Sequence, residues 1–349
     1  AKFVIDNSLT LDLTINPDFS QVEVDDQITN LTRFEVSLPE KRQFFIENSD
    51  LFSSFGDKGD SNPFFSRRIG IARDINGNSI QNKIIAGLRL SGKINNEFRI
   101  GLINMLTEED LENNIASNNN TVLALQHKVF NRSNISLLFI NKESVKDYDF
   151  ESDDKPFNRV IGIDYNLASS NSKWEGKYYF HKSITPNLEN DDISAGIRTN
   201  YNSRKINFKV GALYIGDNFN SDLGYIKRKP IYKIDPRIGY RFWPENKKIL
   251  NHQFEVAPFI TWMSNLNNQL SDYFIFSKWD IEFKSGVNFN ISLRNQYTYL
   301  FDEFDPTGIN NGRPLPANSE YHYNNYEIEF NNYFTSNKFN YSLEQNFGE

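Results

Sequence analysis

The amino-acid sequence predicts an all-β fold made of long antiparallel strands. Aromatic residues make up 15% of the 349 residues, with 30 Phe and 17 Tyr, yet the mean hydropathy is only −0.59. Apolar and polar residues alternate along most of the chain after residue 83, which is the period of a β-strand. Most of these segments reach the roughly 9–11 residues of a tilted membrane strand, whereas soluble strands average about 5–6 residues.

These observations favour an antiparallel transmembrane β-barrel of the outer-membrane type, with about 14–16 strands. Such a sheet has one apolar face toward lipid and one wet face, which reconciles many aromatic residues with a low mean hydropathy. A large soluble β-sandwich or propeller, whose strands also alternate, is the competing interpretation. No run approaches the roughly 18 apolar residues of a transmembrane helix, so a helical membrane protein is excluded.

The composition also limits the chemistry that the chain can perform. There is no Cys, which rules out disulfides and thiolate metal sites. The four His residues are scattered without the spacing of a zinc site, and no nucleotide-binding fingerprint is present, so we predict neither a metal nor a cofactor. The net charge of −7 argues against nucleic acid as a partner, because such proteins carry a basic surface.

The first part of the chain, residues 1–82, is predicted to contain one strand followed by an irregular segment. The strand runs from Asn7 to Ile15 with Leu at alternate positions, and it ends near Pro17, which has no N–H for the strand ladder. Residues 16–70 carry charges of both signs, many Phe and no clear strand period. We expect this irregular segment to fold as a plug inside a barrel or at its periplasmic mouth.

Residues 83–349 are predicted to form the barrel strands. The first of them repeat as hairpins, in which two alternating segments flank a short polar turn. The expected hairpins join 84–90 with 98–102, 123–129 with 135–139, 161–167 with 174–180, and 193–201 with 206–214. Longer alternating strands follow at 232–242, 254–262, 273–283, 287–293, 326–334 and 339–343.

Other features of this region refine the expectation. Pro236 and Pro258 lie inside two strands, where we expect departures from a regular register, because proline normally occurs at edges or bulges. Only residues 107–115 carry the signals of a short helix, with Thr107 as its cap. Long connections at 143–157, 216–229 and 301–318 alternate with tight turns, as in outer-membrane barrels. Aromatic residues near strand ends are typical of an interfacial girdle: Trp243, Trp262, Trp279, Tyr297 and Tyr299.

Ten charged residues of the irregular segment are the candidate lumen or ligand network. Its acidic members are Asp18, Glu23, Asp25, Glu40 and Glu47, and its basic members are Arg33, Lys41, Arg42, Arg67 and Arg68. Arginine binds carboxylates through two parallel hydrogen bonds, so we expect a salt-bridged plug or constriction. Paired carboxylates also hydrolyse glycosides, but carboxylates on one strand face more often pair with basic neighbours, and we assign no catalytic residue.

Three words occur in order between Asn16 and Gly70: NPDFSQVEVD, EKRQFFIE and FFSRRIG. They resemble a family of Bacteroidota outer-membrane proteins whose C-terminal part is a domain of unknown function. A looser similarity to the same family covers the segment from Gly216 to Tyr225. The resemblance implies a location in the bacterial outer membrane and a longer parent protein, of which this chain is a fragment. Because that domain often follows a periplasmic module similar to carbohydrate-binding family nine, it also implies a connection with glycans.

The favoured function is a channel or uptake component for carbohydrate or other polar solutes. One alternative is a non-transporting structural subunit of an outer-membrane protein complex. Another is a membrane-embedded carbohydrate hydrolase that uses the carboxylates between Asp18 and Asp26. The expected partners are outer-membrane lipid, a polar solute or glycan, and other outer-membrane or periplasmic proteins.

Overall fold

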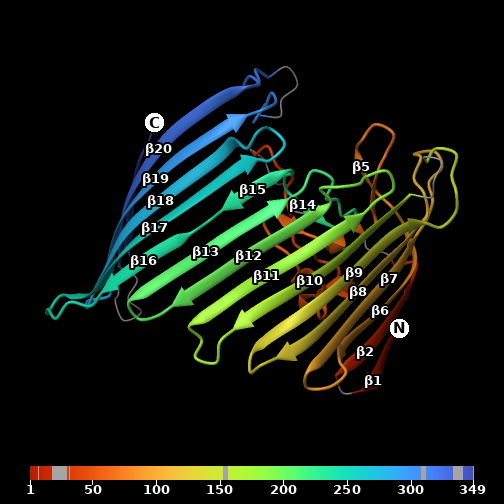
Figure 1. Cartoon of the computed structure of the whole chain (residues 1–349), viewed down its shortest axis with the longest axis horizontal. Coiled ribbons are helices and arrows are strands. Elements are labelled where there is room, and N and C mark those ends of the chain that lie inside the picture. Colours follow the sequence, from red (N-terminus) through yellow and green to blue (C-terminus); the bar gives the residue numbers. More distant parts are fainter. Residues whose placement is uncertain are drawn as a thin grey trace. The chain divides into compact units, whose positions relative to one another are not determined.

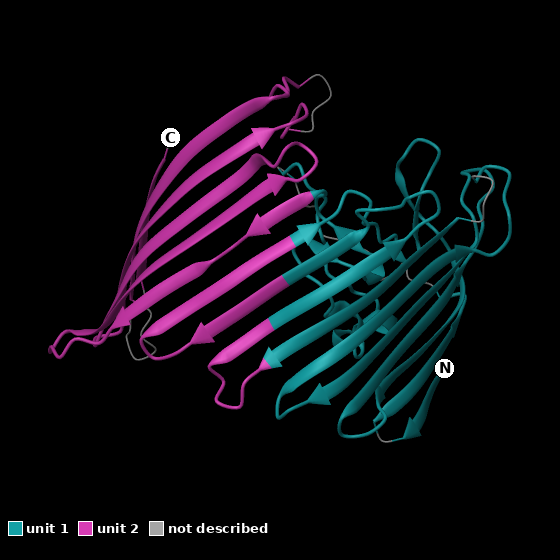
Figure 2. Ribbon diagram, in the orientation of Figure 1, with its two compact units in different colours: residues 1–167, 177–196, 214–230 teal, residues 168–176, 197–213, 231–349 magenta. Residues whose placement is uncertain are grey.

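The computed structural model describes residues 1–6, 8–17, 30, 32–151, 156–307, 312–332 and 341–348. Within these residues, 17 strands are hydrogen-bonded into one antiparallel sheet, and two further sheets have two strands each (Figure 1). The prediction of an all-β antiparallel fold is therefore confirmed. None of the helices in these residues has the length and apolar character needed to cross a membrane. The chain divides into two compact units, which are described separately (Figure 2).

Unit 1 consists of residues 1–167, 177–196 and 214–230. Its large strands pair in chain order from β6 to β10, and β2 pairs with both β1 and β6. The large strands with residues in unit 1 are β1 (Lys2–Asp6), β2 (Leu9–Ile15), β6 (Ile84–Lys93), β7 (Phe98–Thr107), β8 (Asn118–Val129), β9 (Ser133–Ser144), β10 (Phe157–Ala168), β11 (Trp174–Ile184), β12 (Ile193–Asn202) and β13 (Ile206–Ile215). From β6 to β13 each strand has 10–12 residues, which is longer than the average of about 5–6 residues for strands of soluble proteins.

The first two predicted hairpins are confirmed by their register, with Leu90 opposite Leu102 and Leu123 opposite Phe139. The first predicted strand is found as β2, and β1, which was not predicted, pairs with it. The helix predicted at 107–115 is wrong, because Thr107 completes β7. Asp110 and Ile115 then exchange backbone hydrogen bonds of 2.9 and 2.8 Å that close a turn.

Between β2 and β6, the described chain forms short helices and small hairpins. These elements are α1 (Gln43–Ile46), α2 (Asp50–Ser53), β3 (Ser61–Asn62), the 3-10 helix η2 (Ser66–Arg68), β4 (Ile71–Arg73) and β5 (Ser79–Gln81). The strand β3 pairs with β14 (Tyr225–Ile226), and β4 pairs with β5 around a predicted turn. In that turn Oδ1 of Asp74 accepts hydrogen bonds from the backbone N–H groups of Asn76 and Asn78, and Gly77 adopts a φ of 83°.

In unit 1, the strands expose apolar side chains on one face, which reverses the polarity expected of the outer face of a soluble sheet. On β10, Ile161 and Ile163 are exposed, whereas Asp164 is buried. On β11, Phe180 is exposed and His181 is buried. The face that bears Asp164 and His181, which we call the inward face, also carries the apolar core. This core includes Ile103, Met105, Val122, Leu138, Ile140 and Val160. Polar and apolar side chains are therefore buried together on one face, and the other face presents apolar side chains to the surroundings.

Unit 2 consists of residues 168–176, 197–213 and 231–349. Besides segments of β10 to β13, it contains β15 (Ile231–Ile234), β16 (Arg237–Phe242), β17 (Ile249–Met263), β18 (Gln269–Phe283), β19 (Val287–Leu300), β20 (Ser319–Asn332) and β21 (Tyr341–Gly348). The prediction of a single strand over 232–242 is wrong, because the segment is divided at Pro236 into β15 and β16. Pro258 stays within β17, opposite Ile275.

The strands of unit 2 show the same reversal of polarity. Ile238 is 62% exposed and Phe254 is 49% exposed on one face. On the other face, polar side chains bond across neighbouring strands, as between Nη2 of Arg294 and Oε2 of Glu327 at 3.1 Å. On the same face, Nε of Arg237 lies 3.6 Å from Oε1 of Glu255 on the neighbouring strand β17.

Short and long connections alternate over most of the chain, as the sequence predicted, except that 243–248, 264–268 and 284–286 are all short. In unit 1, the turns 94–97 and 130–132 are short, and the connections 108–117 and 145–156 are long. In unit 2, the turns 203–205 and 284–286 are short, and the connection 301–318 is long. This alternation is typical of barrels with tight turns at one rim and extended loops at the other.

Candidate functional site

Residues 40–70, which we call the internal segment, pack against the inward face of unit 1 (Figure 1). The segment buries six apolar side chains there: Phe45, Leu51, Phe52, Phe55, Phe64 and Ile69. The ring of Phe52 lies directly over Gly101 of β7, where a Cβ atom would come within 2.6 Å of the ring. Glycine on the strand therefore makes room for an aromatic ring of the segment.

An ion pair holds the two ends of the internal segment together. Arg42 is buried, and its guanidinium binds both carboxylate oxygens of Glu40 at 2.9 and 2.8 Å. The same guanidinium donates to the backbone carbonyls of Ile69 and Ser66, at 2.7 and 2.8 Å. Burial raises the pKa of Glu40, but the hydrogen bonds and charge of Arg42 outweigh it, and the pKa lies below its ordinary value.

A second arginine fixes the first helix of the segment to the sheet. Arg89 of β6 is buried and donates to Oδ2 of Asp12 on β2 at 2.7 Å. It also donates to the backbone carbonyl of Phe44 and to that of Glu47, the latter at 2.8 Å. Because these carbonyls lie at the C-terminal end of α1, the cation satisfies acceptors that the helix leaves without a partner.

A buried carboxylate connects the middle of the segment to β10 and β11. Oδ2 of Asp164 accepts a 3.0 Å hydrogen bond from the backbone N–H of Gly56, and it lies 3.2 Å from Nζ of Lys177. Oδ1 of Asp164 lies 2.7 Å from Nε2 of His181. Lys177 also donates to the backbone carbonyl of Ser54. We call Asp164, Lys177 and His181 the buried latch, because all three meet around the turn at residues 54–56.

The two stretches that carry the family resemblance contact each other. The backbone N–H of Phe65 donates to the carbonyl of Leu223 at 2.7 Å, and Nε of Arg68 donates to the carbonyl of Gly224 at 2.9 Å. The hydroxyl of Tyr225 reaches the carbonyl of Glu35 at 2.8 Å. The long connection after β13 therefore closes over the internal segment.

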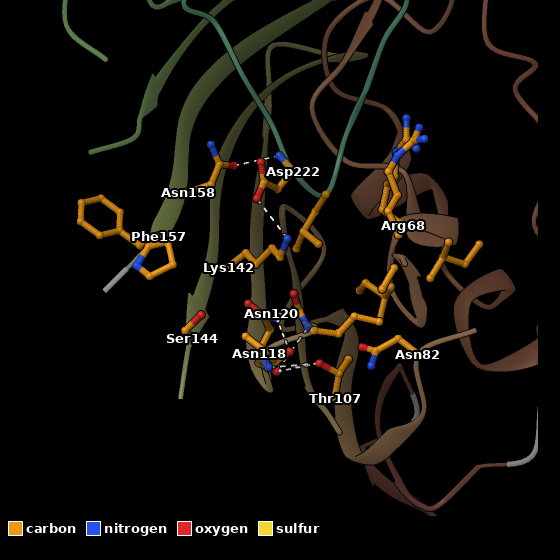
Figure 3. Close-up of a pocket in the computed structure, with 18 of the residues that line it drawn as sticks. Arg68, Asn82, Thr107, Asn118, Asn120, Lys142, Ser144, Phe157, Asn158 and Asp222 are labelled. Carbon is orange, nitrogen blue, oxygen red and sulfur yellow. Dashed lines mark hydrogen bonds and ion pairs between the residues drawn. The ribbon is translucent and has the colours of Figure 1, made fainter. Parts of the chain in front are cut away.

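A polar cavity of about 520 Å³ lies beside this contact, entirely within unit 1 (Figure 3). It is bordered by η2 and β4, by the loop 114–118, and by the ends of β8, β9 and β10. Asparagine is the most frequent lining residue: Asn82, Asn114, Asn118, Asn120, Asn158 and Asn187. Each amide group both donates and accepts hydrogen bonds, so the lining suits a neutral polar molecule or ordered water.

One ion pair and one carboxylate border the cavity. Nζ of Lys142 lies 3.1 Å from Oδ2 of Asp222, whose backbone N–H donates to Oδ1 of Asn158 at 2.9 Å (Figure 3). Oε1 of Glu151 accepts a 2.7 Å hydrogen bond from Ser144, and its buried Oε2 has no protein partner among the described residues. A buried carboxylate oxygen without a partner marks a position where water or a ligand group gains a strong hydrogen bond.

Two loops at the edge of the cavity are held together by one half-buried carboxylate. Oε2 of Glu109 lies 2.7 Å from both Nζ of Lys146 and the hydroxyl of Tyr148. The same hydroxyl accepts a hydrogen bond from the backbone N–H of Ser117. The hydrogen bonds from Lys146 and Tyr148 hold the pKa of Glu109 below its ordinary value, and the carboxylate raises the pKa of Lys146.

The ten charged residues predicted as a network have varied surroundings. Asp18, Glu23 and Asp25 lie outside the described residues. Arg42 pairs with Glu40, Arg68 pairs with Glu35 at 2.6 Å, and Glu47 pairs with Lys2 and Arg89. Arg67 donates to the carbonyl of Pro39, and the guanidinium of Arg33 lies over the ring of Phe34. Lys41 adjoins Glu40, which accepts a hydrogen bond from its backbone N–H. The role of these ten residues as a ligand network stays a prediction, as does the division at residues 82 and 83.

Sequence reasoning missed the residues of the sheet that anchor the segment. These are Arg89, Asp164, Lys177 and His181, each on an inward position of its strand; the apolar neighbours Ile163 of Asp164 and Phe180 of His181 are exposed. The sequence offered one signal for these anchors, which is a charged residue at a polar position of a strand whose other positions are apolar. Among the described residues, no group of three or more His, Asp and Glu is placed to hold a metal ion.

The fold and these contacts define a protein of long antiparallel strands, whose inward face holds a folded internal segment and a polar cavity. The chain belongs to the family described as domain of unknown function DUF5916, whose family model matches residues 1–348. No curated protein and no solved structure matches the chain. The predicted resemblance to a domain of unknown function is thereby confirmed, and its Bacteroidota and outer-membrane parts stay predictions.

Proposed function

We propose that this protein is an outer-membrane β-barrel that passes polar solutes across the membrane, with the internal segment as a plug. The observation that carries the proposal is the reversed polarity of the strands. In water, an exposed apolar side chain lacks the stabilisation of about 25 cal/mol per Å² that burial of its apolar surface would give. In a lipid bilayer the same surface is in its preferred environment, and the polar side chains belong on the face away from lipid.

The position of aromatic residues supports a membrane location. In unit 2, Trp174, Tyr201 and Phe208 form one cluster, with the rings of Trp174 and Tyr201 centred 4.8 Å apart. Phe254 and Trp279 stack at 5.3 Å on neighbouring strands. Both clusters lie near the strand ends that lead into short turns, where the aromatic girdle of a barrel meets the lipid headgroups.

The inward face supports a polar solute rather than an apolar one. In unit 1 it contains the asparagine-lined cavity, and in unit 2 it carries ion pairs and amides across neighbouring strands. Such groups bind water and polar molecules without a large net charge. The connection with glycans comes from the family resemblance, and the polar solute is the broader proposal that these residues support.

A non-transporting structural subunit is a second candidate function, because the internal segment is held by many buried contacts. The buried latch, Arg42 and Arg89 together bind the segment at both ends and in the middle. The third alternative, a hydrolase, depends on Asp18 to Asp26, which lie outside the described residues.

A reversible crosslink tests whether the internal segment acts as a plug. The hydroxyl oxygens of Ser61 in the segment and Ser194 on β12 lie 2.8 Å apart, a separation suited to a disulfide after replacement of both residues by Cys. Residues 1–349 contain no Cys, so Ser61→Cys/Ser194→Cys creates a single defined bond once any Cys elsewhere in the full-length protein has been replaced by Ser. The single variants Ser61→Cys and Ser194→Cys are matched controls.

Single-channel conductance of the full-length protein in planar bilayers is the measurement. We expect the oxidised double variant to conduct less than the same protein after reduction by dithiothreitol, and the single variants to be insensitive to the reductant. Equal conductance in both redox states would contradict a moving plug. Silence of every folded form would overturn the channel and favour the structural subunit.

A further inference from the structure

The polar face of unit 2 carries a strip of aromatic rings on β17 to β20. Phe259 of β17 lies opposite Phe274 of β18, which lies opposite Gln296 of β19, and Gln296 lies opposite Tyr323 of β20. Phe276 follows two residues after Phe274 on the same face. The rings of Phe274 and Phe276 are almost parallel, with an interplanar angle of 5° and centroids 6.3 Å apart.

These rings belong to the face that holds the charged ladder, and not to the exposed apolar face. Phe276 lies opposite Arg294, and the next inward residues, Lys278 and Glu327, flank Ser292. The three Phe rings are only partly buried, and Tyr323 is 45% exposed. Aromatic rings on a wet sheet face are unusual unless something stacks on them, because a water-facing surface is otherwise polar.

The charges beside the strip are already paired within the protein. Arg294 lies 3.1 Å from Glu327, and Nζ of Lys278 lies 2.7 Å from Asp280. The guanidinium of Arg294 also lies 5.9 Å from the ring centroid of Phe276. The ammonium of Lys233 lies 4.6 Å from the ring centroid of Phe259. The strip therefore offers many hydrogen-bonding groups of both kinds, and its cations Arg294 and Lys278 are each paired with a carboxylate.

Three buried polar atoms next to the strip have no protein partner among the described residues. They are Oγ of Ser292, Oδ1 of Asn290 and Oδ1 of Asn325. Ser292 is 2% exposed and lies between Lys278 and Glu327 in register, and Asn325 lies opposite Arg294. A buried polar atom that stays unpaired costs about 1–3 kcal/mol, so these positions favour a ligand or water that bonds to them.

We propose that this strip binds a neutral oligosaccharide. A sugar ring has an apolar C–H face that stacks on an aromatic ring, and its edge carries hydroxyl groups that both donate and accept hydrogen bonds. Phe274 and Phe276 of β18 and Tyr323 of β20 supply ring faces, and the paired charges and unpaired amide and hydroxyl atoms supply the edge contacts. An anionic ligand would need an unbalanced basic group, and an apolar ligand would leave the charged ladder without solvent. The inference deepens the proposed function by naming its solute class.

Isothermal titration of the full-length protein in detergent tests the strip directly. The probes are maltohexaose, cellohexaose and laminarihexaose, with the anionic hexamer of galacturonic acid for comparison. The test variant is Phe274→Leu/Phe276→Leu, which keeps apolar volume but removes both rings. The matched control is Phe254→Leu, an exposed ring on the opposite face of the neighbouring strand β17.

We expect at least one neutral hexamer to bind wild-type protein, and the double variant to bind it at least about tenfold more weakly. The control should bind it like the wild type. Heat-dependent gel mobility verifies that each variant is folded. Ser292→Ala, which removes the unpaired hydroxyl beside the strip, should weaken oligosaccharide binding by a smaller factor than the double variant. Unchanged affinity in the folded double variant, absence of binding to all three neutral hexamers, or a preference for the anionic hexamer would overturn the proposal.

The same samples separate this inference from the proposed function. Oligosaccharide binding without solute flux into liposomes would overturn transport and leave the strip as a binding surface. Solute flux without binding of any neutral hexamer would overturn the strip and leave transport in place.

Discussion

The backbone N–H of Gly56 donates a 3.0 Å hydrogen bond to Oδ2 of Asp164, although the two residues are 108 positions apart in the chain. Asp164 is 1% exposed, and its second oxygen lies 2.7 Å from Nε2 of His181. Gly56 has a φ of 64°, and a Cβ atom there would lie 2.2 Å from the carbonyl oxygen of Ser61. The turn of the internal segment is therefore shaped to present one N–H group to one buried carboxylate.

Replacing Asp164 by Ala should release the middle of the internal segment. The change leaves the N–H of Gly56 and the ring of His181 without their buried acceptor, and loss of one partner of a buried pair costs about 3–5 kcal/mol. Amide hydrogen exchange of residues 54–61 is expected to become faster, while exchange in β17 stays unchanged. Ile161→Ala, on the exposed face of the same strand, is the control. Equal protection in Asp164→Ala and Ile161→Ala would show that the latch does not hold the segment.

Arg42→Lys should be nearly as disruptive as Arg42→Met. The guanidinium binds Glu40 through two nitrogens and two backbone carbonyls at the same time, which a single ammonium cannot reproduce. We expect loss of about 2–4 kcal/mol of docking free energy of the segment, seen as faster cleavage of residues 40–70 by a protease. Arg73→Lys, which disturbs an exposed hydrogen bond to Gly77, should leave cleavage unchanged. Full protection in Arg42→Lys would contradict this assignment.

Acidification should loosen the same contact. The pKa of Glu40 is lower in the folded protein than its ordinary value of 4.5, so its stabilising contribution is complete above that value. The contribution is lost as the pH falls through the lower, folded pKa, because protonation removes the charge that Arg42 binds. Protease cleavage of the segment, measured from pH 7 to pH 3, should rise below about pH 4.5 in the wild type. Glu40→Gln should be cleaved faster at pH 7 and show a weaker pH dependence, and parallel profiles would contradict the role of Glu40.

Gly224→Ala should separate the long connection after β13 from the internal segment. A Cβ atom at Gly224 would lie 2.7 Å from the carbonyl oxygen of Asn62 and 2.8 Å from that of Pro63, so the backbones must move apart. The hydrogen bond from Arg68 to the carbonyl of Gly224 would be lost with that movement. We expect faster hydrogen exchange at Phe65, whose N–H bonds Leu223. Gly59→Ala has no contact closer than 3.4 Å and serves as the control, and a similar response of both variants would refute the steric explanation.

Sequence periodicity predicted the strands well because their two faces differ so strongly in polarity. The pairs Leu90 with Leu102 and Leu123 with Phe139 lie in hairpins that alternation alone identified. The helices α1 and α2 have four residues each, which is too short for a helical period to appear in the sequence. The break at Pro236 followed the general behaviour of proline, whereas Pro258 was accommodated inside β17.

The site was less predictable than the strands, because its contacts join distant parts of the chain. Charged residues near one another in sequence suggested a network, and Glu40 with Arg42 is such a pair. The partner of Gly56 is Asp164, and the partners of Glu47 are Lys2 and Arg89, which no local pattern connects. A single polar residue inside an apolar-faced strand marks an inward position, but it does not say which segment will cover it.

The central claim is that the exposed apolar face of the strands contacts lipid and the opposite face contacts water. Nitroxide labels at residues 253, 254, 255 and 256 of β17, one position at a time, test it in the full-length protein reconstituted in liposomes; residues 1–349 contain no Cys, and any Cys elsewhere in the protein is first replaced by Ser. We expect labels replacing Phe254 and Val256 to be accessible to oxygen and shielded from a water-soluble nickel complex, and labels replacing Gln253 and Glu255 to show the reverse. Access of the nickel complex to all four positions, or shielding of all four from both reagents, would contradict a membrane-spanning strand.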